Sequence, residues 1–199
     1  MSGIFGIVLK KNCAEILLYG TDYHSHMGTE YGGMAVLGKR FYHSIHDISK
    51  SQFKSKFFDD YKEMKGHLGI GVVSDRDPQP LIIGSKFGNF AIVSAGLIEN
   101  MNELASELFR EGETFGEMSS GGINSVELIA KLITRGPTLL EGIEGVYDRI
   151  RGSASILLLQ KDGIYAARDR LGRTPLVIGE KDGEYAVATE TCSFLNLGF

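Results

Sequence analysis

The chain alternates between short apolar runs and segments whose apolar residues recur at helical spacing. The short runs are rich in β-branched residues and are bounded by turn-forming residues, so each predicts a strand. We expect strands at residues 4–9, 33–37, 40–45, 69–73, 81–83, 90–93, 154–160, 164–167, 176–178 and 185–188. The helical spacing predicts helices at residues 14–19, 101–110, 126–134 and 138–146, and either one amphipathic helix or two short ones within 49–64.

The order of these elements indicates the fold class. Strands come first, helices dominate the middle, and a closing series of strands follows, with turn signals at 161–163, 171–172 and 181–183. This order is typical of an α+β layered domain with a closing antiparallel meander, not of a parallel βαβ sheet. No repeat, linker or low-complexity tract divides the chain, so we expect residues 1–199 to form a single domain.

Composition and charge narrow the classes of function. The chain has 199 residues, of which 43% are hydrophobic and 23% charged, and its formal net charge is -4. This balance is ordinary for a globular protein and gives no basic surface for nucleic acid or for an anionic membrane. No apolar segment approaches the ~18 residues that span a bilayer. Cys13 and Cys192 have neither metal-ligand spacing nor a disulfide framework, so we expect a cytoplasmic protein without metal or cofactor.

The N-terminal segment offers the first candidate chemistry. A buried strand that starts at Ile4 would hold Ser2 at a fixed point of the fold. In the N-terminal-nucleophile arrangement, a Ser, Thr or Cys at the first mature position attacks the substrate, and its own α-amine, with a pKa near ~8, takes the proton. Ser2 fits this role once Met1 is removed. The alternative is an ordinary edge strand with a polar lead-in.

Several motifs, taken in order, resemble a known family. They read SGIFGI at 2–7, HMGTEYGGM at 26–34, KGHLGIG at 65–71, GIYAARD at 163–169 and ATETC at 188–192. Together they resemble the glutaminase domain of the amidophosphoribosyltransferases, which are class II glutamine amidotransferases. The resemblance covers essentially the whole chain and implies the four-layer αββα sandwich of the N-terminal-nucleophile hydrolases. The family continues into a phosphoribosyltransferase domain, and no segment here is similar to the phosphate-binding loop of that domain.

The resemblance also implies a glutamine site, where this chain departs from the family. The family's nucleophile is a Cys, and this chain has Ser2 at that position. The Arg of the family's Gly-His-x-Arg-Tyr motif, which clamps the glutamine carboxylate, corresponds to Ser74, and a neutral hydroxyl does not replace a bidentate charged contact. Arg76 lies two residues further on and offers a substitute, although its neighbours Asp75 and Asp77 favour a solvated salt bridge in a turn.

Two further parts of the implied site are changed. The family's His-Asn-Gly oxyanion hole corresponds here to a segment ending in Ala95 and Gly96, so the backbone donor is kept and the side-chain donor is lost. The Asp that holds the glutamine α-amine corresponds to Ser125, or to Asn124 if the alignment slips by one residue. Of that motif only Glu127 matches the family.

These changes together predict a degenerate member of the family. The resulting hypothesis is a binding or regulatory module, with a role implied in purine biosynthesis, that docks on a separate phosphoribosyltransferase or synthetase subunit and forms a homo-oligomer. The alternative is an active amidohydrolase or glutaminase that uses Ser2 as nucleophile and delivers ammonia to a transferase partner. Met1 discriminates between them, because the N-terminal mechanism requires the free α-amine of Ser2.

Other side-chain groups have structural interpretations. The histidine pairs lack a matching Cys or carboxylate cluster for a metal, so we expect them in loops or at the surface, with His26 in a structural hydrogen bond. The glycine-rich segment 119–122 is either a phosphate cradle or a flexible loop, and the lack of a Lys favours the loop. We expect Asp169 to cap a turn and three phenylalanines to lie in the core. The histidine pairs are His24 with His26 and His43 with His46, and the phenylalanines are Phe53, Phe57 and Phe58.

Overall fold

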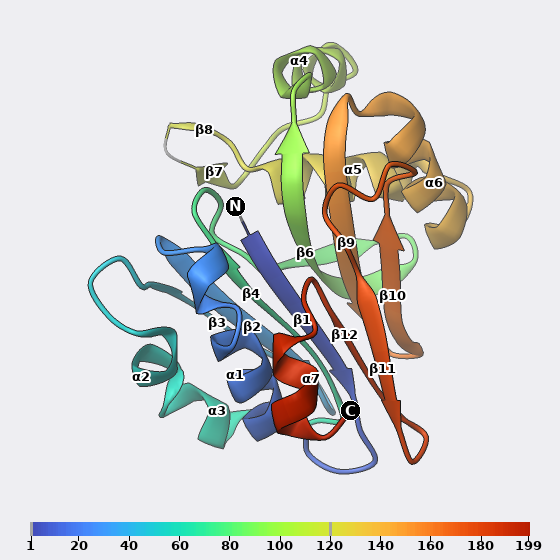
Figure 1. Cartoon of the computed structure of the whole chain (residues 1–199). Coiled ribbons are helices and arrows are strands. Elements are labelled where there is room, and N and C mark those ends of the chain that lie inside the picture. Colours follow the sequence, from blue (N-terminus) through green and yellow to red (C-terminus); the bar gives the residue numbers. More distant parts are fainter. Residues whose placement is uncertain (1, 120) are drawn as a thin grey trace.

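Two antiparallel sheets lie face to face between outer layers of helices in the computed structural model, which describes residues 2–119 and 121–199 (Figure 1). The larger sheet has the strand order β11-β12-β1-β4-β2-β3, and the smaller sheet has the order β10-β9-β6-β5. The larger sheet comprises β1 (Ser2–Val8), β2 (Tyr31–Leu37), β3 (Phe41–Asp47), β4 (Leu68–Ser74), β11 (Val177–Lys181) and β12 (Glu184–Ala188). The smaller sheet comprises β5 (Leu81–Ser85), β6 (Gly88–Ile98), β9 (Gly152–Gln160) and β10 (Gly163–Arg168).

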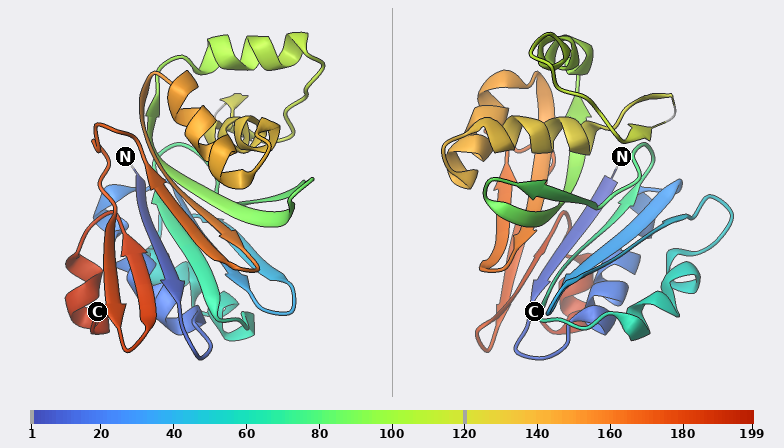
Figure 2. Two further views of the ribbon diagram at one scale, coloured as in Figure 1. Left: turned by 90° about the vertical axis from the view of Figure 1, so that its right-hand side faces the viewer. Right: turned by 180° about the vertical axis from the view of Figure 1, so that it is seen from behind.

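The helices cover the two outer faces of this sandwich (Figure 2). The larger sheet is covered by α1 (Ala14–Asp22), α2 (Phe53–Phe57), α3 (Asp60–Glu63) and α7 (Cys192–Leu197). The smaller sheet is covered by α4 (Met101–Arg110), α5 (Ser125–Arg135) and α6 (Leu139–Arg149). A 3-10 turn, η1 (Ser25–Met27), and a short hairpin of β7 (Met118–Ser119) and β8 (Gly122–Ile123) complete the described elements. No helix in the described ranges is long and apolar enough to cross a membrane.

Strand β1 shows why the first apolar run lacks alternation. Ile4 faces the core between the two sheets, whereas Phe5 and Ile7 face the core beneath α1, and all three are fully buried. A strand covered on both faces reads as a continuous apolar run. α1 approaches this strand closely because Gly20 has no side chain: a Cβ there would overlap the ring of Phe5. The expected αββα sandwich is therefore confirmed, with three stacked apolar cores.

The structure corrects several details of the predicted elements. Residues 49–64 form two short helices, the second of the two expected arrangements. Phe53 and Phe57 stack in the core with ring centroids 4.4 Å apart, but the expected burial of Phe58 is wrong, because it is 48% exposed. His24 lies in the turn between α1 and η1, the loop position that was one of its two expected settings, but its side chain is fully buried and not at the surface. The short elements η1, α7, β7 and β8 were not predicted.

Local hydrogen bonds explain two other sequence features. The carboxylate of Asp169 accepts hydrogen bonds from the backbone N–H groups of Leu171 and Gly172, both at 2.9 Å, which confirms its role as a turn cap. His26 Nε2 lies 2.9 Å from a carboxylate oxygen of Glu190, the structural contact expected of it. Within the glycine-rich segment 119–122, residue 120 lies outside the described residues, and the pairing of Ser119 with Gly122 forms part of the short hairpin.

Candidate functional site

A cavity of about 560 Å³ opens where the ends of β1, β6 and β9 meet the first turn of α5. Five segments contribute to its wall, and they are far apart in the sequence. They are Ser2; Asp75, Arg76, Asp77 and Gln79; Ser94 to Glu99 with Met101 and Asn102; Ile123, Ser125 and Ile129; and Ser153 with Ala154. The fold therefore brings Ser2, Arg76, Ala95, Gly96 and Ser125 together, five of the seven positions that the sequence singled out.

Ser74 supports this cavity from behind its wall. Ser2 and Ser74 are paired across β1 and β4, and the hydroxyl of Ser2 donates to the hydroxyl of Ser74 at 3.3 Å. Ser74 is buried, and its Oγ accepts hydrogen bonds from the backbone N–H groups of Arg76 and Asp77, both at 3.2 Å. A Ser side chain that bonds the backbone two and three residues on is a common way to fix a turn. Ser74 thus shapes the turn that carries Arg76 and Asp77.

The oxyanion-hole positions lie at the end of β6. Ala95 is buried and ends in a methyl group, so its side chain offers no hydrogen-bond donor. Gly96 pairs with Ala154 across β6 and β9 and has a φ of 140°. A Cβ at Gly96 would overlap the carbonyl oxygen of Ser153, so both the backbone conformation and the close packing require glycine here. The cavity wall at this point is therefore sterically fixed.

Gln79 is a buried residue of this site that sequence reasoning did not single out. Its side-chain amide pairs with the backbone of Ser94: the Ser94 N–H donates to Gln79 Oε1 at 2.8 Å, and Gln79 Nε2 donates to the Ser94 carbonyl at 3.1 Å. This contact ties the loop after β4 to β6. The sequence shows only a Gln between two prolines, Pro78 and Pro80, and that pattern carries no signal for such a contact.

The first turn of α5 holds the same loop from the other side. The hydroxyl of Ser125 donates to a carboxylate oxygen of Asp77, which is only 9% exposed. The side-chain amide of Asn124 donates to the carbonyl of Pro78 at 2.9 Å, and its Oδ1 caps the helix by accepting from the N–H of Val126 at 2.8 Å. Sequence reasoning placed Asp77 only in a solvated turn. The structure instead places its carboxylate at the cavity wall.

The charged side chains of the cavity include both signs. Arg76 is exposed, and the salt bridge expected between it and Asp77 is not found among the described residues, because the carboxylate of Asp77 is directed to Ser125. Asp75 Oδ1 accepts from the N–H of Thr29 at 2.8 Å and from its hydroxyl at 3.3 Å. Partial burial acts to raise the pKa of Asp75, but hydrogen bonds, including those from Thr29, outweigh it and hold the pKa below its usual value.

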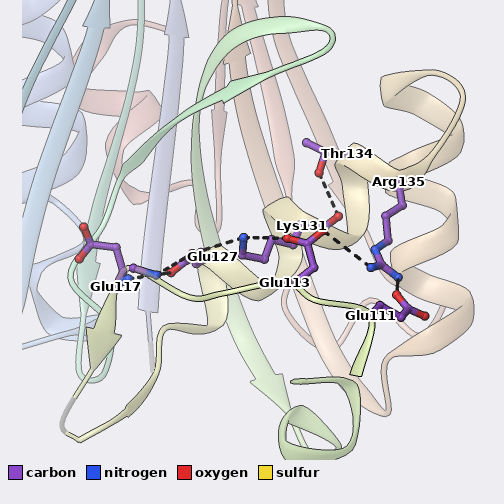
Figure 3. Close-up of polar contacts among 8 residues, drawn as sticks. Glu111, Glu113, Glu117, Glu127, Lys131, Thr134 and Arg135 are labelled. Atoms are coloured by element: carbon purple, nitrogen blue, oxygen red, sulfur yellow. Dashed lines mark hydrogen bonds and ion pairs between the residues drawn. The ribbon is translucent and has the colours of Figure 1, made fainter. Parts of the chain in front are cut away.

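Glu127, the seventh predicted position, does not line this cavity. Its carboxylate lies on the other side of α5 and accepts hydrogen bonds from the backbone N–H groups of Gly116 and Glu117 (Figure 3). His24 also lies outside the cavity wall, packed behind the backbone of Gly3. Burial lowers the pKa of the His24 imidazole below its usual value. In the described part of the chain, no group of three or more His, Cys, Asp or Glu side chains is arranged to hold a metal ion.

Comparisons with known proteins point to one family. A family model described as a glutamine amidotransferase domain matches residues 66–196. The amidophosphoribosyltransferase of Methanocaldococcus jannaschii is 28% identical over 213 aligned positions, which cover 99% of this chain and 44% of that relative. The amidophosphoribosyltransferase of Archaeoglobus fulgidus is 30% identical over 140 positions, covering 69% of this chain and 30% of that protein. The chain thus spans less than half the length of these relatives.

A solved structure shows the same arrangement of layers. The glutamine phosphoribosylpyrophosphate amidotransferase from B. subtilis, solved in complex with ADP and GMP, superposes with a TM-score of 0.87 at 26% sequence identity. The superposition covers 98% of this chain and 43% of that chain. The similarity of the two folds therefore extends over nearly every element described above.

Proposed function

The chain belongs to the glutamine amidotransferase domain family, and from this membership we propose that it is an amidophosphoribosyltransferase-like domain that no longer hydrolyses glutamine and acts as a binding or regulatory module. One observation supports the proposal: Ala95, which by resemblance corresponds to the family's oxyanion-hole Asn, lines the cavity and has a side chain with no hydrogen-bond donor. Loss of one oxyanion donor costs about 3 kcal/mol of transition-state stabilisation, or roughly a hundredfold in rate.

The nucleophile position supports the same conclusion. Among the described residues, the hydroxyl of Ser2 has one hydrogen-bond contact, to the hydroxyl of Ser74, which is not a base at neutral pH. A Ser hydroxyl needs general-base assistance, whereas a Cys is partly thiolate at neutral pH. A Ser nucleophile and a missing donor in one cavity weaken both the attack and the stabilisation of the intermediate.

The charges of the cavity favour a second candidate function. Arg76 and Asp77 line the same cavity as Ser2 and carry the two charges that would bind a zwitterionic substrate, from positions that differ from the family pattern. An amidohydrolase or glutaminase that uses the N-terminal amine of Ser2 as base and passes ammonia to a transferase partner is the function that this observation supports.

The proposed partner is a separate phosphoribosyltransferase or synthetase subunit. The named relatives are amidophosphoribosyltransferases more than twice as long as the region that matches this chain, so the remaining length of such proteins is the natural model for that partner. A role in purine biosynthesis, a cytoplasmic location and a homo-oligomeric state belong to the same proposal.

Ammonia release from glutamine tests the proposal directly. The experiment uses untagged protein of determined N-terminal mass, together with its Ser2→Cys and Ser2→Ala variants. We expect no ammonia above the blank from the wild type or from Ser2→Cys. Turnover by the wild type that disappears in Ser2→Ala would overturn the proposal in favour of the second candidate. Turnover by Ser2→Cys alone would show that the pocket binds glutamine and that the nucleophile is the missing part.

A further inference from the structure

We propose that Glu127 is a positioning residue that fixes one wall of the candidate cavity by clamping the backbone that leads into the β7–β8 hairpin. This inference goes beyond the proposed function, because it concerns how the wall is held and not which ligand or reaction the cavity serves. The evidence for it is a buried carboxylate that accepts hydrogen bonds from main-chain N–H groups.

The carboxylate of Glu127 is almost completely buried, and both of its oxygens accept hydrogen bonds from the main chain. The residue is 8% exposed, and its Oε2 accepts from the N–H of Glu117 at 2.7 Å. The N–H of Gly116 lies 3.0 Å from both Oε1 and Oε2. A buried charge is tolerated only where hydrogen bonds or an ion pair replace its lost hydration. Hydrogen bonds to an ionised group are also roughly twice as strong as neutral ones, so this contact fixes two successive peptide groups.

The clamped peptides lead directly to the cavity wall. The carbonyl of Glu117 accepts from the N–H of Asn124 at 3.2 Å, which closes the base of the hairpin. Met118 of β7 pairs with Ile123 of β8, and Ile123 lines the cavity. The positions of Gly116 and Glu117 therefore set the position of Ile123. All of these residues lie in the described part of the chain.

The same helical turn also holds the opposite side of the wall. Asn124 and Ser125 bind the loop that carries Pro78 and Asp77, while Glu127 binds the segment before β7. One turn of α5 thus joins two loops that would otherwise be independent. Its first residues face the cavity, and Glu127 acts from behind it.

The surrounding ion pairs are weaker candidates for this role. Lys131 lies 3.7 Å from Glu127 and 3.3 Å from Glu113, and Arg135 contacts Glu111 and Glu113 (Figure 3). The side chains of Glu111 and Glu113 are 44% and 39% exposed, and exposed ion pairs contribute little stability. Lys131 offsets part of the charge of Glu127, but the shortest contacts of Glu127 are to the main chain. We therefore assign the positioning role to Glu127 and not to the network as a whole.

The test compares Glu127→Gln with Glu113→Gln, which removes an exposed charge from the same network. The Gln amide keeps one acceptor oxygen but directs an NH₂ group toward the N–H donors of Gly116 and Glu117. We expect amide hydrogen exchange at these two residues to quicken about tenfold or more in Glu127→Gln and to stay within about twofold in Glu113→Gln. The side-chain methyl signal of Ile123 should shift only in Glu127→Gln. Equal exchange in both variants, or an unmoved Ile123 signal, would overturn the proposal.

A titration of the wild type provides a readout that does not depend on any variant folding. If Glu127 binds the two peptides, the amide proton shifts of Gly116 and Glu117 should follow the same curve as the side-chain carboxyl carbon of Glu127 when the pH is lowered. Glu113, Lys131 and Lys86 line the same surface pocket as Glu127, so their resonances are followed in parallel. Amide shifts that follow Glu113, or that do not titrate, contradict the assignment. Neither result depends on ammonia release, so failure here and failure of the proposed function are distinguishable.

Discussion

The space between the sheets and the cavity at its edge are built from the same strands by different means. Along β1, Ile4 belongs to the apolar core between the sheets, and Ser2, on the same face two residues earlier, lines the cavity. β9 shows the same change, from Leu157 in the core to Ser153 in the cavity wall. The strand centres interlock through close-packed apolar side chains, whereas the strand ends are held by hydrogen bonds to loops.

This difference explains how chemistry can change while a fold persists. Residues at the strand centres contact several layers at once, so a change there disturbs both sheets. Residues at the strand ends contact one loop or a cavity, and a substitution there alters fewer packed contacts. The contrast predicts that stability is concentrated in the core, apart from a few strand-end positions with special backbone or hydrogen-bond requirements. The following variants test that contrast.

The largest effect is expected at the centre of β9. Leu157→Ala removes a fully buried side chain from between the sheets, and we expect the free energy of unfolding to fall by about 4 kcal/mol. The matched control is Leu195→Ala in α7, where the side chain is 88% exposed and the expected loss is below about 0.5 kcal/mol. Urea unfolding measures both variants. Similar losses of unfolding free energy at the two sites would mean that stability is not concentrated in the core.

The next variant tests whether a substitution in the cavity wall can cost nearly as much stability as one in the core. Gly96→Ala combines a φ of 140° with overlap against the Ser153 carbonyl, so we expect a loss of about 3 kcal/mol. Gly112→Ala is the control, because its φ is 85° and no atom lies within 4 Å of the added Cβ; it should cost about 1 kcal/mol. Urea unfolding that ranks Gly112→Ala as the more harmful change would contradict this account of the cavity wall.

The third variant concerns the hydrogen bonds that join α5 to the loop after β4. Asn124 is fully buried, caps α5 and binds the Pro78 carbonyl, so Asn124→Ala should cost about 2 kcal/mol. Thr138 caps α6 through its bond from the N–H of Glu141 at 3.2 Å in an exposed setting, and Thr138→Ala should cost about 1 kcal/mol. Thermal or urea unfolding of the two cap variants gives the ranking. Equal costs would mean that the link from Asn124 to Pro78 adds nothing to the cap.

The same contrast explains how much of the molecule is predictable from sequence. Apolar periodicity predicted the strand centres and the long helices, because burial of a face imposes a pattern on neighbouring residues. Helix Met101–Arg110 was predicted with its observed bounds, since Asn100 and Gly112 mark its two ends. Short elements such as α7, with six residues, carry too few periodic positions to give such a signal.

The cavity was predictable only in part. Positions 2, 95, 96 and 125 came from the family resemblance, and the fold brings them together. The role of Asp77 depends on a contact with Ser125, 48 residues away, and the role of Gln79 depends on a backbone pair with Ser94. Neither contact leaves a periodic pattern in the sequence. Glu127 is the opposite case. The motif predicted that it lines the pocket, but its side chain extends from the other side of α5 and binds the N–H of Glu117.

The smallest effect is expected at Asp169, which supports the cavity wall from the rear. Its carboxylate accepts from the hydroxyl of Ser153 at 2.8 Å and from the N–H of Ala154 at 3.3 Å, and both residues line the cavity. Burial acts to raise the pKa of Asp169, but the hydrogen bonds from Ser153 and from backbone N–H groups outweigh it, so the pKa lies below its usual value. Asp169→Asn should therefore cost about 1 kcal/mol at neutral pH.

The pH dependence of that loss gives the sharper test. A carboxyl whose pKa is lower in the folded state than in the unfolded chain stabilises the fold above the unfolded value, near pH ~4, and this contribution disappears as the pH falls through the folded value. The difference in unfolding free energy between wild type and Asp169→Asn should thus be constant from neutral pH down to about 5 and shrink below about 4. Asp148→Asn, which changes an exposed carboxylate on α6, serves as the control and should show little difference at neutral pH. A gap for Asp169→Asn that persists unchanged in acid would mean that Asp169 acts through its shape and not its charge, and that the rear of the cavity wall is held by packing, as the core is.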